Sequence, residues 1–210
     1  MTRKITSGPI RNKERTKIKL LRSVGTILKK DGFVGLSVTN IAKKADVNRK
    51  LIYEYYGTLD NLVKDYLNST DYWRVSLDQI DEIIEKGRED CGKQAAYDLL
   101  ENQFESLMKN EEMRKIITWG LSADLMPLRK LNRERELLAE RLFTRLIDSH
   151  FMGKDKNIRA IDAILVGGIY YLTLQANMSG ETMCGIDVNT AEGQIEVKKA
   201  LKQIIDWAYS

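Results

Sequence analysis

Proline is scarce in this chain, and that scarcity constrains the fold more than any other feature. The 210 residues contain only Pro9 and Pro127, so long stretches hold no residue that breaks a helix. Apolar residues recur at helical spacing in most segments, and no segment alternates convincingly between apolar and polar residues as a half-buried strand does. The sequence therefore predicts an all-α fold of about nine helices.

Charge is distributed unevenly along the chain. Residues 1–67 hold 15 Lys and Arg against 6 Asp and Glu, a net of +9, and the remainder holds 19 against 24, a net of −5, which together give +4. A basic segment joined to a mildly acidic body indicates that the first part meets a polyanion. A solvated charged surface would give the same totals, so charge alone does not decide.

Composition predicts a cytoplasmic protein. Hydrophobic residues make up 43% and charged residues 30%, which is ordinary for a soluble globular chain. Cys91 and Cys184 form no disulfide or metal-binding motif, and residues 1–5 lack the apolar run of a signal peptide. The most apolar stretch, 161–176, contains Asp162 and is shorter than the roughly 20 residues of a membrane span. We expect it to be a buried helix, with no membrane partner.

Short helices separated by tight turns are predicted within residues 13–62. The first helix covers 13–31, where apolar residues recur at helical spacing. Ser37 is a favourable N-cap for a short second helix, a tight turn follows at Asp46, and Asn48 caps a third helix. This arrangement is typical of a helix-turn-helix unit.

The third of these helices carries the functional hypothesis. Arg49 and Lys50 stand in its first turn, where the helix dipole makes cations mildly unfavourable. The placement makes sense if both side chains enter a major groove, with Tyr53 and Tyr55 offering hydroxyls to phosphates. A surface turn with incidental charges would look the same, and this helix alone leaves the two interpretations even.

The stretch from Ile18 to Leu62 resembles the DNA-binding domain of the TetR family of transcription regulators. The matching residues span the whole motif with its spacing: Gly32, Leu36-Ser37-Val38, Ile41-Ala42, Ala45-Asp46-Val47-Asn48, Tyr53-Glu54-Tyr55-Tyr56-Gly57-Thr58 and Leu62. Family members usually have Gly at the turn position of Asp46, and Asp tolerates the left-handed backbone needed there. Many also have a phosphate-contacting Lys where this chain has Leu59.

The resemblance implies a fold and a function. We expect a flexible basic arm over 1–12, a three-helix helix-turn-helix DNA-binding domain over 13–62, and a larger helical ligand-binding and dimerisation domain over 63–210. The implied protein is a homodimeric regulator, commonly a repressor, that binds a palindromic operator in double-stranded DNA and is released by a small-molecule effector. Neither the effector nor the operator can be identified from the sequence.

Residue roles follow by position in the motif. Val38, Ile41, Ala42, Val47 and Ile52 are expected to form the small core that sets the angle between the helices. Lys13 or Arg15 could add phosphate contacts near the first helix. The residues expected to contact DNA are Lys17, Thr39, Asn40, Asn48, Arg49, Lys50, Leu51, Tyr53, Tyr55 and Thr58.

The larger domain offers a hypothesis for dimerisation. Gly167 and Gly168 lie in the middle of an apolar helix, where each costs about 1 kcal/mol, and close approach of another helix would explain them. A two-fold four-helix interface between this helix and the last one is expected, although both could be ordinary core helices. The expected interface residues are Ile164, Gly167, Gly168, Tyr171, Leu201, Ile204 and Ile205.

A ligand pocket is harder to locate from sequence. Aromatic and Met side chains suit apolar ligands, although such residues are more often core. The candidates for lining a pocket are Trp73, Trp119, Met126, Tyr170 and Tyr171.

Two other classes of protein are alternatives to a DNA-binding regulator. An enzyme is disfavoured, because the single histidine, His150, stands in no catalytic arrangement and no metal-ligand cluster or phosphate loop occurs, so neither cofactor nor metal is expected. A helical adaptor that kept the fold but binds protein is encouraged slightly by Leu59 and discouraged by the basic N-terminal segment. Steep salt dependence of duplex binding would separate the adaptor from the regulator.

Overall fold

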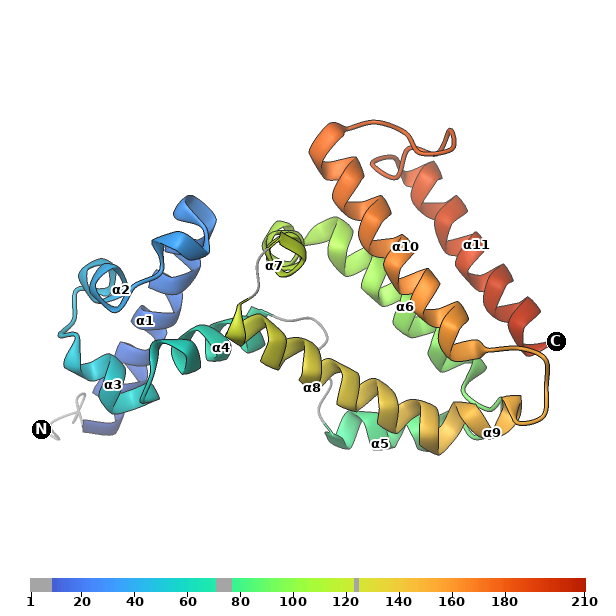
Figure 1. Cartoon of the computed structure of the whole chain (residues 1–210), viewed down its shortest axis with the longest axis horizontal. Helices are drawn as coiled ribbons and strands as arrows, with labels where there is room; N and C mark the ends of the chain where they lie inside the picture. The colour runs from blue at the N-terminus through green and yellow to red at the C-terminus, as the bar shows by residue number, and fades with distance from the viewer. Residues whose placement is uncertain (1–8, 71–76, 123–124) are drawn as a thin grey trace, which may run out of the picture. The chain divides into compact units, whose positions relative to one another are not determined.

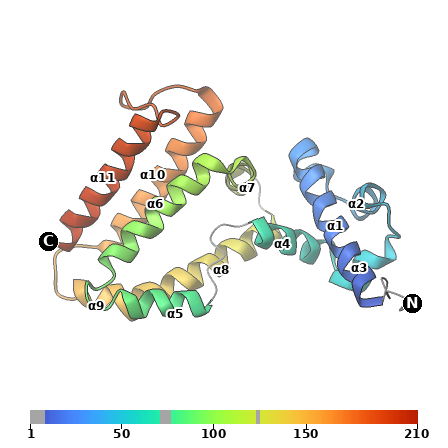
Figure 2. The same cartoon turned by 180° about the vertical axis from the view of Figure 1, so that it is seen from behind.

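The computed structural model describes residues 9–70, 77–122 and 125–210, and every regular element within those ranges is a helix (Figures 1 and 2). An isolated antiparallel bridge between Met183 and Ile186 is the one β-type pairing among them. The prediction of an all-α fold is confirmed. The elements are α1 (Pro9–Asp31), η1 (Phe33–Gly35), α2 (Val38–Ala45), α3 (Lys50–Tyr56), α4 (Leu59–Thr70), α5 (Leu77–Lys86), α6 (Lys93–Lys109), α7 (Glu111–Ser122), α8 (Met126–Leu142), a π-helical turn η2 (Phe143–Ile147), α9 (Asp148–Phe151), α10 (Ile158–Ser179) and α11 (Ala191–Tyr209).

The chain forms two compact units. One combines residues 1–71 with residues 119–131, and the other combines residues 72–118 with residues 132–210. The division falls inside α7 and α8, so each of these helices has residues in both units. The sequence predicted a domain boundary near residue 62 and therefore assigned residues 119–131 to the larger domain, whereas the structure groups them with the first unit.

The first unit is built around α1. This helix packs on both α2 and α4, and α3 packs on α4. Its buried stripe runs through Leu20, Val24 and Ile27, whereas Ile18 is 48% exposed. The helix begins at Pro9 rather than near Lys13, because proline is favoured at the first helical position, where no amide donor is needed. Residues 9–12, assigned by sequence to the flexible arm, are therefore helical.

Local caps fix the turns of the motif as predicted. The Ser37 hydroxyl accepts the Asn40 amide proton at 3.1 Å, and Asn48 Oδ1 accepts that of Lys50 at 2.9 Å. Asp46 ends α2 in the left-handed conformation with φ 54° and ψ 54°. The second and third helices thus meet at a turn whose geometry each of these side chains helps to define.

The second unit is a helical layer centred on α6. Both α10 and α11 pack on α6 and on each other, and their shared core includes Leu100, Phe104, Ile169, Leu201 and Ile205 (Figure 1). The expectation that α10 is a buried helix is wrong, because only one of its faces points into this core. Its other face lies open on the surface of the unit.

The charged segment from α8 to α9 is not a regular α-helix throughout. Between α8 and α9 the backbone widens into the π-helical turn Phe143–Ile147. Ion pairs hold this region in place: Arg159 at the start of α10 binds both Glu140 and Asp148. Such widened turns inside helices often lie at functional sites.

Candidate DNA-binding surface and ligand cavity

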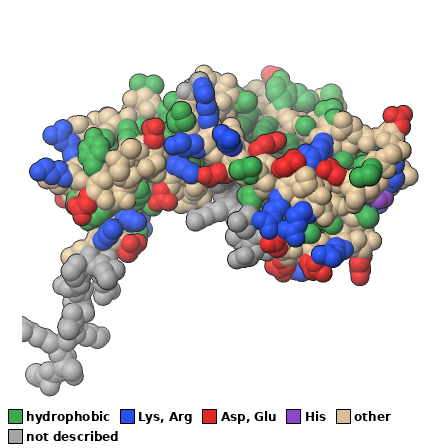
Figure 3. Space-filling model, turned by 60° about the horizontal axis from the view of Figure 1, so that its bottom comes forward, with side chains coloured by type: hydrophobic (Ala, Val, Ile, Leu, Met, Phe, Trp, Pro, Cys, Tyr) green, Lys and Arg blue, Asp and Glu red, His purple; other side chains and the backbone are tan. Residues whose placement is uncertain are grey.

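The first turn of α3 presents its cations to solvent. Arg49 and Lys50 are exposed, and Tyr53 one turn later is 56% exposed, while Ile52 between them is completely buried. Because residues 49, 50 and 53 share one face of a helix, the buried Ile52 holds that face outward. On the side of the molecule drawn in Figure 3, cationic side chains lie at the surface of the part that carries α1 to α4.

Cations of α1 lie beside the tyrosines of α3. The Lys17 ammonium is 5.6 Å from the ring centre of Tyr56, and the Lys13 ammonium is 5.2 Å from that of Tyr55. At these distances the ring faces attract the ammonium groups. The structure thereby places two α1 cations next to the aromatic end of α3.

Three side chains of the expected DNA-contact set already make hydrogen bonds within the unit, and one of them is Asn48, which accepts the Lys50 amide proton. The Asn40 side-chain amide donates to the Gly35 carbonyl at 2.9 Å, and the Thr58 hydroxyl accepts the Asn61 amide proton at 3.2 Å. Leu51 and Tyr55 are half-buried, whereas Thr39 is exposed. Of the set, Arg49, Lys50, Tyr53 and Thr39 are therefore the most accessible groups without a hydrogen bond to their own unit.

Burial raises the pKa of the Tyr56 hydroxyl to about 12, and the carboxylates of Asp65 and Glu14 add to the shift. The hydroxyl oxygen is buried without a hydrogen-bond partner. Tyr56 is consequently neutral at physiological pH and acts as a packing and cation-binding surface rather than as an anion.

The expected core of the motif is largely present. Ile41, Ala42 and Ile52 are buried, and Val38 and Val47 are half-buried beside them. The position usually held by Lys, Leu59, is half-buried at the start of α4. The third helix is thus anchored through apolar contacts on one side while its cationic side faces solvent.

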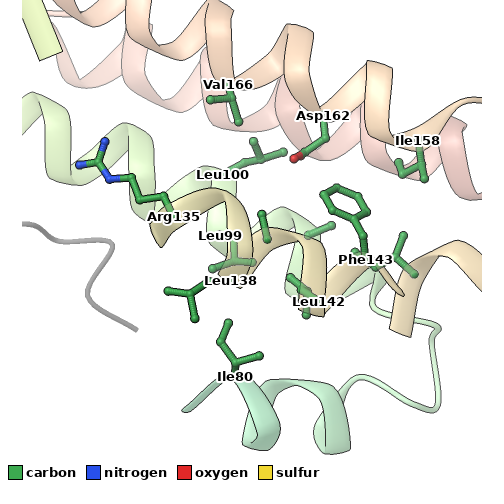
Figure 4. Close-up of a pocket in the computed structure, with 13 residues that line it drawn as sticks. Ile80, Leu99, Leu100, Arg135, Leu138, Leu142, Phe143, Ile158, Asp162 and Val166 are labelled. Carbon is green, nitrogen blue, oxygen red and sulfur yellow. The ribbon is translucent and has the colours of Figure 1, made fainter. Parts of the chain in front are cut away.

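A cavity lies within the second unit, between α5, α6, α8 and α10 (Figure 4). The cavity volume, measured as the space open to the centres of water-sized molecules, is about 60 Å³. Its walls are apolar apart from Arg135 and Asp162, and they consist of Ile80, Ala96, Leu99, Leu100, Arg135, Leu138, Ala139, Leu142, Phe143, Ile147, Ile158, Asp162 and Val166. Apolar walls with a few polar groups are typical of small-molecule sites.

Of the residues expected to bind ligand, none of the four that the structure describes lines this cavity. Trp119 belongs to the first unit and packs edge-on against Phe33, with 5.0 Å between ring centres. Met126 is 52% exposed, Tyr171 is 59% exposed, and Tyr170 packs against the core of the second unit. Trp73 lies outside the described residues. Aromatic or Met side-chain type alone had suggested these positions, whereas the cavity is lined mostly by aliphatic side chains, with Phe143 as its one aromatic residue among those described.

Asp162 is a candidate ligand-binding residue that was not among those predicted from the sequence. In Figure 4 its carboxylate points into the space bounded by Leu100 and Phe143. Burial raises the pKa of this carboxyl to about 6. The signal was present in the sequence, because an acidic residue interrupts an otherwise apolar helix.

The outward face of α10 carries apolar residues at helical spacing. Ile164 is 74% exposed, Tyr171 59% and Met178 79%, and Gly167 and Gly168 lie between them. A Cβ placed on either glycine would meet no atom of its own chain within 4 Å. This face is therefore flat and open to the approach of another helix.

The last helix contributes differently from expectation. Leu201 and Ile205 are buried in the core of their own unit, at 5% and 1% exposure, so their side chains do not reach the outward face. Ile204 is half-buried, and Trp207 is 66% exposed. The side of α11 that carries Leu201 and Ile205 packs on α6.

No cluster of three or more His, Cys, Asp or Glu suited to a metal ion occurs among the described residues. Within the same ranges one helix, α10, is long and apolar enough to cross a membrane, with 22% of its most apolar window buried. Core helices of soluble proteins pass the same test, so this finding alone assigns no location.

No protein-family model matches the sequence, and no curated protein matches it either. Solved structures do. NalD of Pseudomonas aeruginosa, the secondary repressor of the MexAB-OprM multidrug efflux pump, is 18% identical with a TM-score of 0.66, over 94% of this chain and 96% of its own.

Two others extend the comparison. A TetR-family transcription regulator of Marinobacter aquaeolei is 17% identical with a TM-score of 0.59, over 93% of this chain and 97% of its own. The transcriptional regulator FadR of Bacillus subtilis, solved with stearoyl-CoA, is 13% identical with a TM-score of 0.57, over 90% of this chain and 96% of its own.

In this chain a unit with helix-turn-helix geometry is joined to a helical unit with an internal cavity. The chain has the fold of the TetR-family transcription regulators.

Proposed function

We propose that this chain is a transcription repressor that binds a palindromic operator as a homodimer and leaves it when a small molecule occupies the second unit. The observation that carries the proposal is the exposed face of α3, where Arg49, Lys50 and Tyr53 point outward from a helix fixed by Asn48 and Ile52. A recognition helix reads base edges with the residues of its N-terminal turn.

The supporting contacts surround that face. Lys13 and Lys17 of α1 lie beside the tyrosines of α3, where they can neutralise phosphates flanking the groove. Leu59 supplies no cation at the start of α4, so the backbone amides of that helix N-terminus take over the phosphate contact in this proposal. Thr39 of α2 completes the set from the neighbouring helix.

A homodimer supplies the second recognition helix. The outward face of α10, with Ile164, Tyr171 and two open glycines, is apolar and lies open on its own unit. A second copy of the same face would bury it around a two-fold axis, and the glycines would let the two helices approach closely. The proposed interface is thus centred on Ile164, Gly167, Gly168 and Tyr171, with Ile204 and Trp207 at its edge.

Release follows from a shift between two states of the dimer. Helix α8 carries cavity residues in the second unit, and its first turns, residues 126–131, belong to the first unit. An occupant that fits one arrangement of α8 better than the other changes the separation of the recognition helices, and operator affinity changes with it. Acting on chromosomal DNA, the protein is expected in the cytoplasm.

Selection from a random duplex pool tests the proposal. The protein is purified under denaturing conditions and refolded, which removes any copurified ligand, and circular dichroism confirms its helices before selection. Enrichment of a palindrome with half-sites about one duplex turn apart, roughly 34–36 Å, is expected. No enriched sequence from folded protein would overturn DNA recognition and leave the protein-binding adaptor as the better interpretation.

A further inference from the structure

The charge inside the cavity restricts what can occupy it. Its walls come from four helices and the π-helical turn of one unit, and Leu100, Phe143 and Val166 are among the hydrocarbon side chains that line it together with Asp162 (Figure 4). None of them can donate a hydrogen bond to a carboxylate. An ionised carboxylate in such surroundings is costly unless a donor or a cation reaches it.

Asp162 makes no hydrogen bond or ion pair in the structure, and burial is the sole resolved cause of its raised pKa of about 6. At neutral pH the group is mostly ionised all the same. A Leu or Val at this position would stabilise the fold more, because the carboxylate contributes little packing and loses hydration. A carboxyl kept under those conditions is typical of a binding function.

The charged neighbours leave the carboxylate unneutralised. On α8, Arg135 contributes its aliphatic stem to the wall, and Figure 4 shows its guanidinium directed away from Asp162. On α10 itself, Arg159 is held by Glu140 and Asp148 and lies over the Phe143 ring. On α11, the Tyr209 hydroxyl, whose pKa is raised by burial and by the Asp162 carboxylate, donates to the Cys91 carbonyl at 3.2 Å.

A second orphaned polar group lies on the same helix face as part of the wall. Gln103 of α6 is completely buried, and neither its amide nitrogen nor its amide oxygen has a hydrogen-bond partner. It follows Leu99 and Leu100 by one helical turn, so the three share a face of α6. The cavity wall thus carries the half-buried carboxylate of Asp162, and a fully buried amide without a hydrogen-bond partner lies on the same face of α6 outside the lining.

We propose that the cavity binds a small aliphatic or aromatic amine, with the protonated nitrogen paired to Asp162 and the hydrocarbon part against Leu100, Leu142 and Phe143. A buried ammonium and carboxylate form a charge-assisted hydrogen bond, which is stronger than one between neutral groups. The π-helical turn that carries Phe143 and Ile147 supplies a wall that can adjust to the length of the hydrocarbon. The binding step stands on the cavity alone, and only its effect on operator release rests on the proposed function.

Isothermal calorimetry of the full chain with hexylamine, hexanol and hexanoate tests the charge preference at about pH 7.5, because the three share a hydrocarbon chain and differ in charge. We expect hexylamine to bind at least about tenfold more tightly than hexanol, and hexanoate to bind weakest, since one buried charge pair is worth about a factor of ten or more. Asp162→Asn should remove the preference for the amine and leave hexanol affinity within about twofold. The exposed Asp155→Asn is the matched control and should change nothing.

The outcomes separate cleanly. Equal affinities for the three compounds, tightest binding of hexanoate, no binding of any of them, or unchanged amine binding in Asp162→Asn would each overturn the proposal. Lowering the pH to about 5 should reduce the preference for the amine in the wild-type chain, because Asp162 becomes protonated while the amine stays charged. Since calorimetry contains no DNA, failure here leaves the selection experiment unaffected, and failure of the selection leaves amine binding unaffected.

Discussion

The exposed faces of α3 and α10 carry side chains of opposite character. The outward face of α3 carries Arg49, Lys50 and Tyr53, all of which are well solvated as they stand. The outward face of α10 carries Ile164, Tyr171 and Met178 around two glycines, which water solvates poorly. The face of α3 is well hydrated without a partner, whereas the apolar face of α10 would be stabilised by burial against another surface.

The difference indicates how the two partners bind. Under the proposed function, contacts made by α3 would exchange counterions for phosphates, so they would be reversible and sensitive to salt. Contacts made by α10 with a second copy would remove apolar area from water, so they would be persistent and insensitive to salt. A regulator needs both kinds: a permanent dimer and an operator contact that can be released.

The largest expected effect comes from placing a charge on the apolar face. Gly168→Glu should abolish the dimer and weaken operator binding by about 100-fold or more, because two linked recognition helices are replaced by one. The variant should still fold, since its Cβ meets no atom of its own chain. Sedimentation velocity measures the mass, and fluorescence anisotropy measures affinity for the selected duplex. Asn132→Glu, an equal charge change at an exposed position of α8, should remain dimeric.

Removing one cation from α3 should have the next largest effect. Arg49→Ala is expected to weaken binding to the selected operator by roughly 1–3 kcal/mol, with the dimer and the unfolding temperature unchanged. Tyr53→Phe should weaken it less, because only a hydroxyl is lost. Arg133→Ala, which removes an exposed cation from α8, is the control for net charge. Equal losses in Arg49→Ala and Arg133→Ala would show that α3 does not read the operator.

Asp162→Asn should stabilise the unliganded chain by roughly 2 kcal/mol at neutral pH. The folded-state pKa of Asp162, about 6, lies above its ordinary value of 3.8, so the folded chain takes up a proton more readily than the unfolded chain. Wild-type stability is therefore lost, relative to the variant, as pH rises from about 4 to about 6. Urea unfolding at about pH 4.5 and about pH 7.5 measures this, and an equal stability difference at the two pH values would contradict it.

The smallest expected effect concerns the turn before α3. Asp46 holds a left-handed backbone at φ 54°, so Asp46→Gly should raise stability by up to about 1 kcal/mol and Asp46→Ala should lower it by a similar amount. Thermal unfolding followed by circular dichroism checks both. The operator affinity of folded Asp46→Gly should match that of the wild type. A stabilising Asp46→Ala substitution would show that the backbone at this position is not strained for ordinary side chains.

The sequence predicted the first unit well because its turns are local. Ser37 and Asn48 cap their helices through side-chain hydrogen bonds two or three residues away, and Asp46 adopts the left-handed turn that the motif requires. Such geometry depends on neighbouring residues in the chain, which a pattern of residue types can capture.

The second unit was harder to predict because its features depend on distant segments. The apolar period of α11 indicates which side is buried but not whether α6 or a partner covers it, and Leu201 and Ile205 were accordingly assigned to the dimer interface. The cavity needs Ile80, Leu100, Leu142 and Asp162 together, and no local rule brings these four residues side by side. The widened turn at Phe143 has no recognised residue signature either.

The π-helical turn between α8 and α9 changes the direction in which the side chains beyond it point. In an α-helix each residue advances the rotation by about 100°, so one extra residue within a turn changes the direction in which everything beyond it faces. Here that extra residue separates the cavity wall from the ion-paired end near Asp148. A molecule that contacts Phe143 would meet the helix where its hydrogen bonds already depart from the α-helical register. A change of register at that point would rotate the part of the helix beyond it.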